Sequence, residues 1–218
     1  PTKCLCGALT KKEVSKITKK EDAVRRCSKG YDCKFTAKEK LKHIVSKEAF
    51  NIDGLGKKVI DQFWKLNFIK KPSDIFELDF DKIKKLDGWG DLSVKNLKIA
   101  IDQAKNISLN RFIYAIGVRH IGQENAKILA SFFKSASQFA YILKQNHRDA
   151  ILKNLNDLDG IGDTQIFSIK NFFNKNKNVE IVQKLLTKLN IQDFKETNIK
   201  GKLSNTNVMF TGGFEKIS

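Results

Sequence analysis

Apolar residues recur at helical spacing through most of the chain after residue 35. The first such stretch, Ala37–Lys47, places Leu41, Ile44 and Val45 on one face, and Thr36 stands where a residue could cap it. The same spacing predicts further helices over Lys57–Leu66, Leu92–Ala104, Leu109–Ile116, Glu124–Phe133, Gln138–Leu143, Thr164–Phe173 and Val179–Leu189. The connections are short and contain Gly, Asp or Asn. Residues 36–190 are therefore predicted to form a mainly α domain.

Four short glycine turns punctuate this helical pattern, and each opens into a helix. They read Ile52-Asp53-Gly54-Leu55-Gly56, Leu86-Asp87-Gly88-Trp89-Gly90, Arg119-His120-Ile121-Gly122 and Leu158-Asp159-Gly160-Ile161-Gly162. Flanking apolar residues can anchor each turn in a core. The period of 30 to 40 residues indicates a repeated helix pair. A tetratricopeptide-type solenoid has a similar period, but its consensus is absent and it needs no Gly-x-Gly between helices.

A glycine turn at a helix N-terminus can hold a phosphate. Glycines allow close approach, and the unpaired amides of the next helix face the ligand without reading a base. A plain helix C-cap would explain any single Gly-x-Gly, but four in one chain favour a nucleic-acid backbone as the ligand. The candidate contact residues are Gly54, Gly56, Lys57, Lys58, Gly88, Gly90, Lys95, Arg119, His120, Gly122, Lys127, Gly160 and Gly162.

The four turns are not equivalent in sequence. In the third, His120 replaces the first glycine, and we expect a less tight turn there. The fourth is followed by Asp163 and has no nearby cation before Lys170, so we expect it to be mainly structural. The first two have intact glycines and nearby lysines, and they are predicted to contribute most to binding.

The charge of the chain supports a polyanionic partner. There are 41 Lys and Arg against 24 Asp and Glu, a net charge of +17. The excess of Lys over Arg and the many Asn and Ile residues also fit a compositional bias toward AT-rich codons, so the charge carries weight only together with the turns. No apolar run reaches the roughly 18 residues that span a bilayer, and there is no signal peptide.

All four cysteines lie in the first 33 residues, in a segment without apolar periodicity. Cys4, Cys6, Cys27 and Cys33 suit tetrahedral Zn²⁺, and residues 1–35 are predicted to be a Cys4 zinc finger. Arg25 and Arg26 are expected to favour the thiolates. A single residue separates the first two cysteines, which strains both sulfurs onto one metal, and free thiols remain the alternative.

The composition changes after Asn190. Residues 191–206 are polar and are predicted to be a linker, whereas residues 207–218 begin with the β-prone run Val208-Met209-Phe210-Thr211 followed by Gly212. We expect this run to be the first strand of another domain. Because the chain starts without Met and stops inside this run, it is expected to be part of a longer protein.

These features together resemble the C-terminal half of a bacterial NAD-dependent DNA ligase. The likeness covers essentially the whole chain and is carried by the Cys4 element, by Lys42-His43-Ile44-Val45-Ser46-Lys47-Glu48-Ala49-Phe50 before the first turn, by Arg111-Phe112-Ile113-Tyr114-Ala115-Ile116-Gly117-Val118-Arg119, by Asn171-Phe172-Phe173, and by a BRCT-like start at residue 207. The sequence departs from the family pattern at Lys3-Cys4-Leu5-Cys6-Gly7, where the family usually has Cys-Pro-x-Cys-Gly. The resemblance implies a mainly α fold: a Cys4 zinc finger, a four-unit helix-hairpin-helix domain and a truncated BRCT start.

The resemblance also implies a function. Such ligases seal nicks between a 5′-phosphate and a 3′-hydroxyl in duplex DNA during replication and repair, using NAD and Mg²⁺ in domains upstream of this region. The chain itself is then expected to bind nicked duplex DNA without sequence specificity and without ligating it, in the bacterial cytoplasm, with no obligate protein partner and no membrane contact. Lys85-Leu86-Asp87-Gly88 fits the Lys-x-Asp-Gly motif of the adenylated lysine, but Asp87 and Gly88 already belong to the second turn.

Two other functions fit part of the sequence. A non-catalytic helix-hairpin-helix module of another repair protein, such as an excision nuclease subunit, would share the turns, but the preceding Cys4 element argues against it. A protein-interaction scaffold would use the turns only to pack helices. Binding to duplex DNA that weakens steeply with salt distinguishes a DNA-binding chain from a scaffold.

Overall fold

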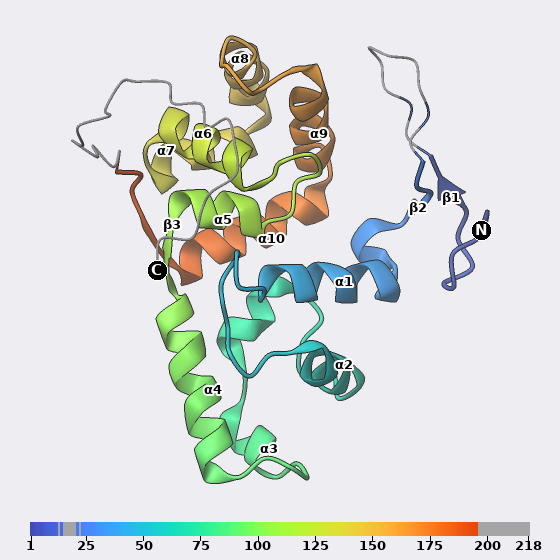
Figure 1. Ribbon diagram of the computed structural model, residues 1–218, viewed down its shortest axis with the longest axis vertical. Helices are drawn as coiled ribbons and strands as arrows, with labels where there is room; N and C mark the ends of the chain where they lie inside the picture. The colour runs from blue at the N-terminus through green and yellow to red at the C-terminus, as the bar shows by residue number, and fades with distance from the viewer. Residues whose placement is uncertain (13, 15–20, 22, 196–218) are drawn as a thin grey trace, which may run out of the picture.

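A computed structural model describes residues 1–12, 14, 21 and 23–195 (Figure 1). The helices are α1 (Lys34–Ile44), α2 (Lys57–Lys65), α3 (Phe80–Lys84), α4 (Asp91–Ala104), α5 (Leu109–Ala115), α6 (Gln123–Phe133), α7 (Ala136–Ala140), α8 (Gln145–Leu155), α9 (Asp163–Phe173) and α10 (Asn176–Lys188). Short 3₁₀ turns cover Gly30–Asp32, Pro72–Glu77 and Tyr141–Leu143. The strands are β1 (Thr10–Lys11), β2 (Arg26–Cys27), β3 (Asn106–Ser108) and β4 (Asn190–Gln192). The fold is therefore mainly α, as predicted.

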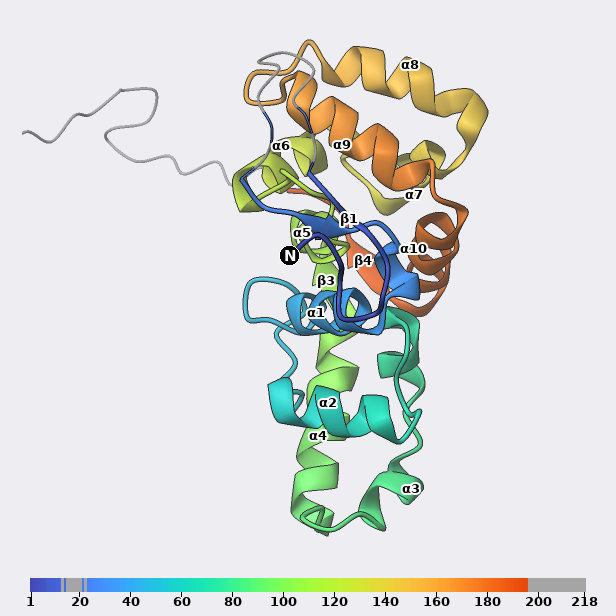
Figure 2. The same cartoon turned by 90° about the vertical axis from the view of Figure 1, so that its right-hand side faces the viewer.

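The helices form two groups joined by a middle layer. In both views α2, α3 and α4 lie in the lower part and α6, α8 and α9 in the upper part, with α1, α5 and α10 between them (Figures 1 and 2). The cysteine-rich segment lies beside this body, at the N-terminal end of α1 (Figure 1). No helix of the described part is both long and apolar enough to cross a membrane.

One hydrophobic core runs through the helical body. Its upper part is aromatic: the ring of Phe139 packs edge-on against Phe112, Phe133 and Phe173, at centroid distances of 5.9, 5.2 and 6.2 Å. These rings come from α5, α6, α7 and α9, so they fix the two later turns relative to one another. Such pairs add about 0.5–1.5 kcal/mol each beyond the area they bury.

The structure corrects the prediction for the first helix. Helix α1 begins at Lys34, and its N-cap is Cys33 rather than Thr36, which lies inside the first turn. The sequence pattern also missed α3 and α8. Helix α3 has five residues, and α8 is polar over its first turns, so neither carries a strong apolar period.

The helical domain extends past residue 190. Strands β3 and β4 pair in parallel, with Asn106 opposite Asn190 and Ser108 opposite Gln192. The amide of Phe194 then donates to the carbonyl of Lys134 at 2.8 Å. The first residues of the predicted 191–206 linker thus belong to the folded domain, while its residues 196–206 and the predicted BRCT start at 207–218 lie outside the described residues.

Candidate nucleic-acid interface and cysteine cluster

The four glycine turns share one backbone hydrogen bond. In each, an amide donates to the carbonyl three residues earlier, at 3.1 to 3.4 Å. The donor and acceptor pairs are Leu55 to Ile52, Trp89 to Leu86, Ile121 to Val118, and Ile161 to Leu158. These flanking residues are buried or packed against the core, which confirms that they anchor the turns.

The same backbone twist occurs in all four turns, including the third. Gly54, Gly88 and Gly160 have φ of +87°, +83° and +85°, and His120 takes the equivalent place at +59°. A hydrogen bond across a four-residue turn with positive φ at its third residue defines a type II turn. The expectation of a looser third turn was therefore wrong: His120 adopts the left-handed conformation that glycine adopts elsewhere.

The second glycine of each turn is the N-cap of the following helix. Gly56, Gly90, Gly122 and Gly162 cap α2, α4, α6 and α9 in extended backbone, and all four are exposed. At the first three, a Cβ atom would meet nothing within 4 Å, so an approaching ligand has open access to the helix amides. At the fourth, the Gln165 side chain accepts a hydrogen bond from the Gly162 amide at 3.2 Å and covers part of that access.

The turns pack in two pairs. The position of a Cβ on Gly54 lies 3.5 Å from Leu97 on α4, which follows the second turn. In the later pair, the Asn125 side-chain amide on α6 donates to the Gly160 carbonyl at 2.8 Å. The connections from α1 to α2 and from α8 to α9 project to the same side of the molecule (Figure 2). One turn from each pair therefore opens on that side.

The lysines that follow the first three turns are exposed. Lys57, Lys58, Lys95 and Lys127 lie on the surface, and no ion pair within the described part of the chain involves them. Lys170, which lies further along α9 after the fourth turn, pairs with Asp149 at 3.1 Å. Arg119 is half-buried, with its Nε and Nη1 atoms inside the protein, so it differs from these lysines.

The ligase-like motif at Lys85 belongs to a turn. Lys85 is the exposed C-cap of α3, and Asp87 and Gly88 form the central residues of the second turn. This placement agrees with the assignment of these residues to a hairpin.

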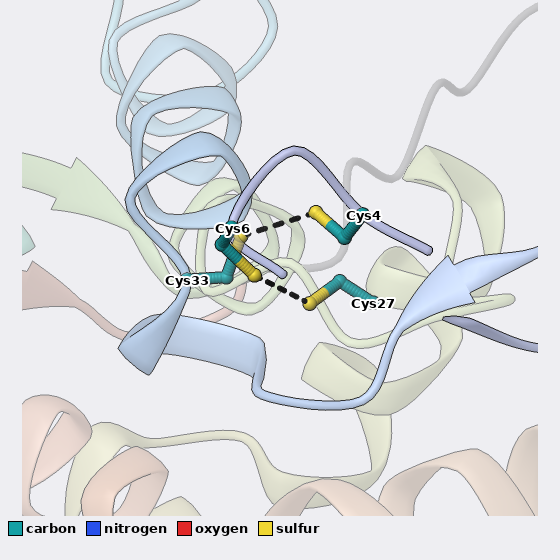
Figure 3. Close-up of side chains that lie close together, drawn as sticks. All are labelled: Cys4, Cys6, Cys27 and Cys33. Carbon is teal, nitrogen blue, oxygen red and sulfur yellow. Dashed lines mark hydrogen bonds between the residues drawn. The ribbon is translucent and has the colours of Figure 1, made fainter. Parts of the chain in front are cut away.

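The four cysteine side chains point toward one another (Figure 3). All four Sγ atoms lie within 4.8 Å of one another, with Cys4 to Cys33 at 3.7 Å and Cys6 to Cys27 at 3.5 Å. Four thiolates about 2.3 Å from a tetrahedral metal would stand about 3.8 Å apart, so the group is close to the size that zinc requires. The structure thus brings all four predicted ligands together in an arrangement that could hold a metal ion.

A tight turn makes the short Cys4–Cys6 spacing workable. The Gly7 amide donates to the Cys4 carbonyl, and the Cys4 amide donates to the Ala8 carbonyl, both at 2.8 Å. Gly7 has φ of +81°, a conformation that glycine adopts without strain. The chain therefore turns within three residues, and both sulfurs reach the same cluster.

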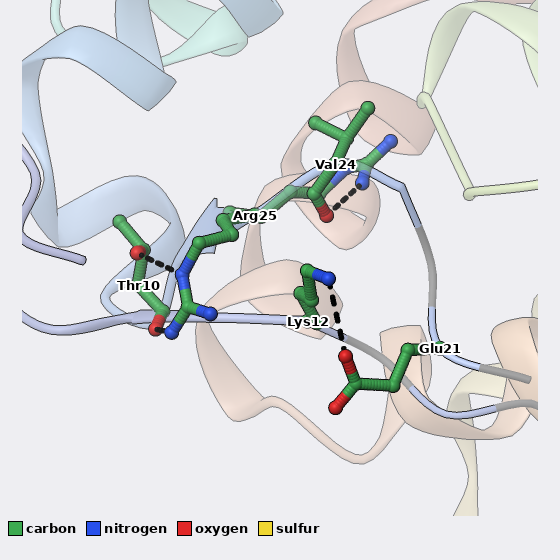
Figure 4. A network of polar contacts seen from close by, with 6 residues as sticks. Thr10, Lys12, Glu21, Val24 and Arg25 are labelled. Atoms are coloured by element: carbon green, nitrogen blue, oxygen red, sulfur yellow. Dashed lines mark hydrogen bonds and ion pairs between the residues drawn. The ribbon is translucent and has the colours of Figure 1, made fainter. Parts of the chain in front are cut away.

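The environment of Cys33 favours its thiolate. Burial raises the pKa of this thiol, but hydrogen bonds from the Thr36 amide and hydroxyl, together with those of the Cys6 and Cys4 thiols, lower the pKa to about 6. Arg25, one of the two arginines expected to act here, instead donates through Nε and Nη2 to the hydroxyl and carbonyl of Thr10 (Figure 4). Arg25 instead stabilises the β1–β2 pair that presents Cys27.

Comparison with known proteins places this architecture in a family. Residues 111–182 match the helix-hairpin-helix motif family. The chain is 48% identical over 220 residues to the DNA ligase of Pelagibacter ubique (strain HTCC1062), covering 100% of the chain and 32% of that protein. Over its whole length, this chain matches part of a bacterial DNA ligase.

Other ligases show the same extent of similarity. The DNA ligase of Rickettsia bellii (strain OSU 85-389) is 41% identical and that of Rickettsia rickettsii (strain Sheila Smith) 42% identical, each over 207 residues. Each alignment covers 91% of the chain and 30% of the relative. The chain thus spans about a third of the length of the curated DNA ligases it matches.

Proposed function

We propose that this chain is the DNA-binding C-terminal portion of an NAD-dependent DNA ligase, and that it holds nicked duplex DNA for sealing. The observation that carries the proposal is the fourfold repeat of one turn, each ending in an exposed glycine at a helix N-terminus. The amides there suit phosphate oxygens, and the dipole of the following helix favours an anion. Because phosphates are the same in every sequence, the binding is sequence-independent.

The residues proposed to contact DNA are expected to contribute unequally to the binding affinity. Gly54, Gly56, Lys57 and Lys58 form the first contact site, and Gly88, Gly90 and Lys95 form the second. His120, Gly122 and Lys127 form the third, with Arg119 reaching it from a half-buried position. Gly160 and Gly162 serve mainly to complete the second pair of turns, because Gln165 and Asn125 occupy their polar groups.

Zn²⁺ is the metal proposed for Cys4, Cys6, Cys27 and Cys33. A site with four thiolates suits zinc and leaves no position open for a substrate, so its role is to fold residues 1–35. The Cys33 ligand is also the N-cap of α1, which ties the finger to the helical domain. NAD and Mg²⁺ are proposed to act in other parts of the protein, in the bacterial cytoplasm, with no obligate protein partner.

Duplex binding tests the proposal. The chain should bind nicked duplex DNA in a fluorescence anisotropy titration, and its affinity should fall steeply with salt, by about 0.9 log units per log unit of salt for each phosphate contact. Sequence should have little effect. A flat salt response, or no binding to duplex, would indicate that the turns only pack helices.

A second experiment tests the proposal that the catalytic steps take place in other parts of the protein. Incubated with NAD, the chain alone should form no lysine–AMP adduct and should seal no nicks. In the longer protein, Lys85→Ala should leave adduct formation unchanged. An adduct on Lys85 would overturn the assignment of catalysis to other parts of the protein.

A further inference from the structure

Two side chains in the middle layer of the fold join the segment before the first turn to the helix before the third. One of them, Arg111, lies on α5 and donates through Nε to the carbonyl of Ala49 at 2.9 Å and through Nη2 to that of Lys47. Both carbonyls belong to the connection between α1 and the first turn. Arg111 thus bonds α5 to a segment more than 60 positions earlier in the sequence.

His43 provides a second contact between α1 and α5, which neighbour each other in both views (Figures 1 and 2). Its Nε2 lies 3.0 Å from the Tyr114 carbonyl, which can only accept, so Nε2 is the donor. The two rings meet edge-on at a centroid distance of 4.9 Å. The His43 ring also covers Gly117, where a Cβ would lie 3.3 Å from Cδ2 of His43. Because Gly117 directly precedes the third turn, His43 contacts the backbone that leads into it.

The connection that Arg111 holds is itself fixed to the first turn. Its amides at Phe50, Asn51 and Ile52 donate to carbonyls at or just after the end of α1, at 2.9 to 3.2 Å. The Ile52 carbonyl then accepts the hydrogen bond of the first turn, from the Leu55 amide. A continuous set of hydrogen bonds therefore runs from the first turn through Arg111 to α5, which leads into the third turn.

We propose that Arg111 and His43 are positioning residues, which hold the first and third turns in the arrangement in which one duplex contacts both. The inference rests on the proposed function. The first turn belongs to the early pair of turns and the third to the later pair, so these contacts join the two pairs. Once the early pair is bound, the later pair stands against the same duplex at a high effective concentration, which raises the affinity without a new contact to DNA.

Arg148 makes the same kind of hydrogen bonds within one group of helices only. It donates to the carbonyls of Ile142 and Leu143 at 2.9 and 3.1 Å. Both residues lie in the 3₁₀ turn before α8, the helix to which Arg148 itself belongs. Arg148 is therefore a matched arginine that stabilises the later group without joining it to the early pair of turns.

The length of the duplex tests the proposal, because a short duplex can reach only one pair of turns. The full 218-residue chain is titrated by fluorescence anisotropy with unnicked duplexes of roughly 8 to 24 base pairs, at about 3.4 Å per pair. The affinity of the parent chain should rise about a hundredfold over this series. Arg111→Gln should keep its affinity for the shortest duplex within about twofold and lose most of the gain with length.

Two further variants separate positioning from general stability. Arg148→Gln should lower the free energy of unfolding yet keep the gain in affinity with length. His43→Phe keeps a ring against Gly117 but removes the donor to Tyr114, so it should lose part of the gain, and it decides the matter if circular dichroism shows that Arg111→Gln does not fold. An unchanged gain in the folded Arg111 and His43 variants, or an equal loss in Arg148→Gln, would overturn the proposal.

The same titrations separate this inference from the proposed function. A lower salt slope of Arg111→Gln on the shortest duplex would make Arg111 a direct phosphate contact and would overturn its positioning role. If the parent chain binds duplex DNA but gains nothing with length, the positioning role fails while the proposed function stands. If the parent chain binds no duplex of any length, the proposed function itself fails.

Discussion

A Cβ atom on Gly160 would lie 2.7 Å from Cδ1 of Ile128, on the helix that follows the third turn. Gly160 also has φ of +85°. We predict that Gly160→Ala lowers the free energy of unfolding by about 1–3 kcal/mol, through backbone strain and a clash that Ile128 must relieve. Urea denaturation followed by circular dichroism measures this.

The control for that variant lies two residues away. Gly162 has extended backbone, and its added Cβ would make only ordinary contact, 3.7 Å from Gln165. Gly162→Ala should therefore cost less than about 1 kcal/mol. Equal losses for the two variants would contradict the role assigned to the Gly160–Ile128 contact.

A substitution of Gly90, the N-cap of α4, should change DNA affinity without a large change in stability. A Cβ on Gly90 would meet nothing within 4 Å, so Gly90→Ala should change the free energy of unfolding by less than about 1 kcal/mol. The added methyl would stand where a phosphate approaches the helix amides, and duplex affinity should fall several-fold. Full duplex affinity in a folded Gly90→Ala variant would show that the second turn does not contact DNA.

Lys40 makes stability depend on pH. Its pKa is lowered by burial from 10.5 to about 8 in the folded state, so folding disfavours its proton. The penalty is complete below pH 8 and disappears as pH rises through 10.5. Since one pKa unit corresponds to about 1.4 kcal/mol, the penalty is on the order of 3 kcal/mol.

Replacement of Lys40 should remove that penalty. At pH 7, Lys40→Met should raise the free energy of unfolding by about 1–3 kcal/mol. The advantage over the parent chain should shrink between pH 8 and 10.5. Lys153→Met, at an exposed position, is the matched control and should show neither effect. A Lys40→Met advantage that is independent of pH would indicate a packing effect instead.

Metal removal should affect only one end of the molecule. The described part of residues 1–33 contains two-residue strands and little buried apolar surface, so a chelator should unfold this segment. Amide hydrogen exchange should show lost protection near Thr10 and Cys27, and retained protection in α4 and α6. Unchanged exchange at Thr10 after complete metal removal would argue against a metal-dependent fold, and metal analysis should find about one zinc per chain.

Much of the helical fold could be predicted from short stretches of sequence. Three of the turns were predictable because a glycine with positive φ two residues before an N-cap glycine is a feature of five consecutive residues. The third turn was misjudged because a histidine in the left-handed region, as at His120, has no reliable sequence signature. Capping by Cys33 was missed because cysteine is not a usual N-cap, and its side chain turns toward the other three cysteines instead of bonding a helix amide.

Features that join distant segments were beyond local reasoning. Strands β3 and β4 have three residues each and pair across 84 positions, so neither carries a periodic signal. The hydrogen bond from Arg111 to the Ala49 carbonyl likewise spans 62 positions. In a chain with 41 Lys and Arg, nothing in the sequence marks this arginine as the one that joins α5 to the segment before the first turn.

The central claim is that the glycine turns and the lysines after them contact the phosphate backbone. The salt dependence of duplex binding tests this claim most directly. In fluorescence anisotropy with nicked duplex DNA, Lys57→Gln with Lys58→Gln should weaken binding and reduce the slope of log affinity against log salt by about 2, one unit for each lost phosphate contact. Lys170→Gln with Asp163→Asn should change affinity and slope much less, because Lys170 already pairs with Asp149. An unchanged slope in the Lys57 and Lys58 variant, or a larger effect of the Lys170 and Asp163 variant, would contradict the claim.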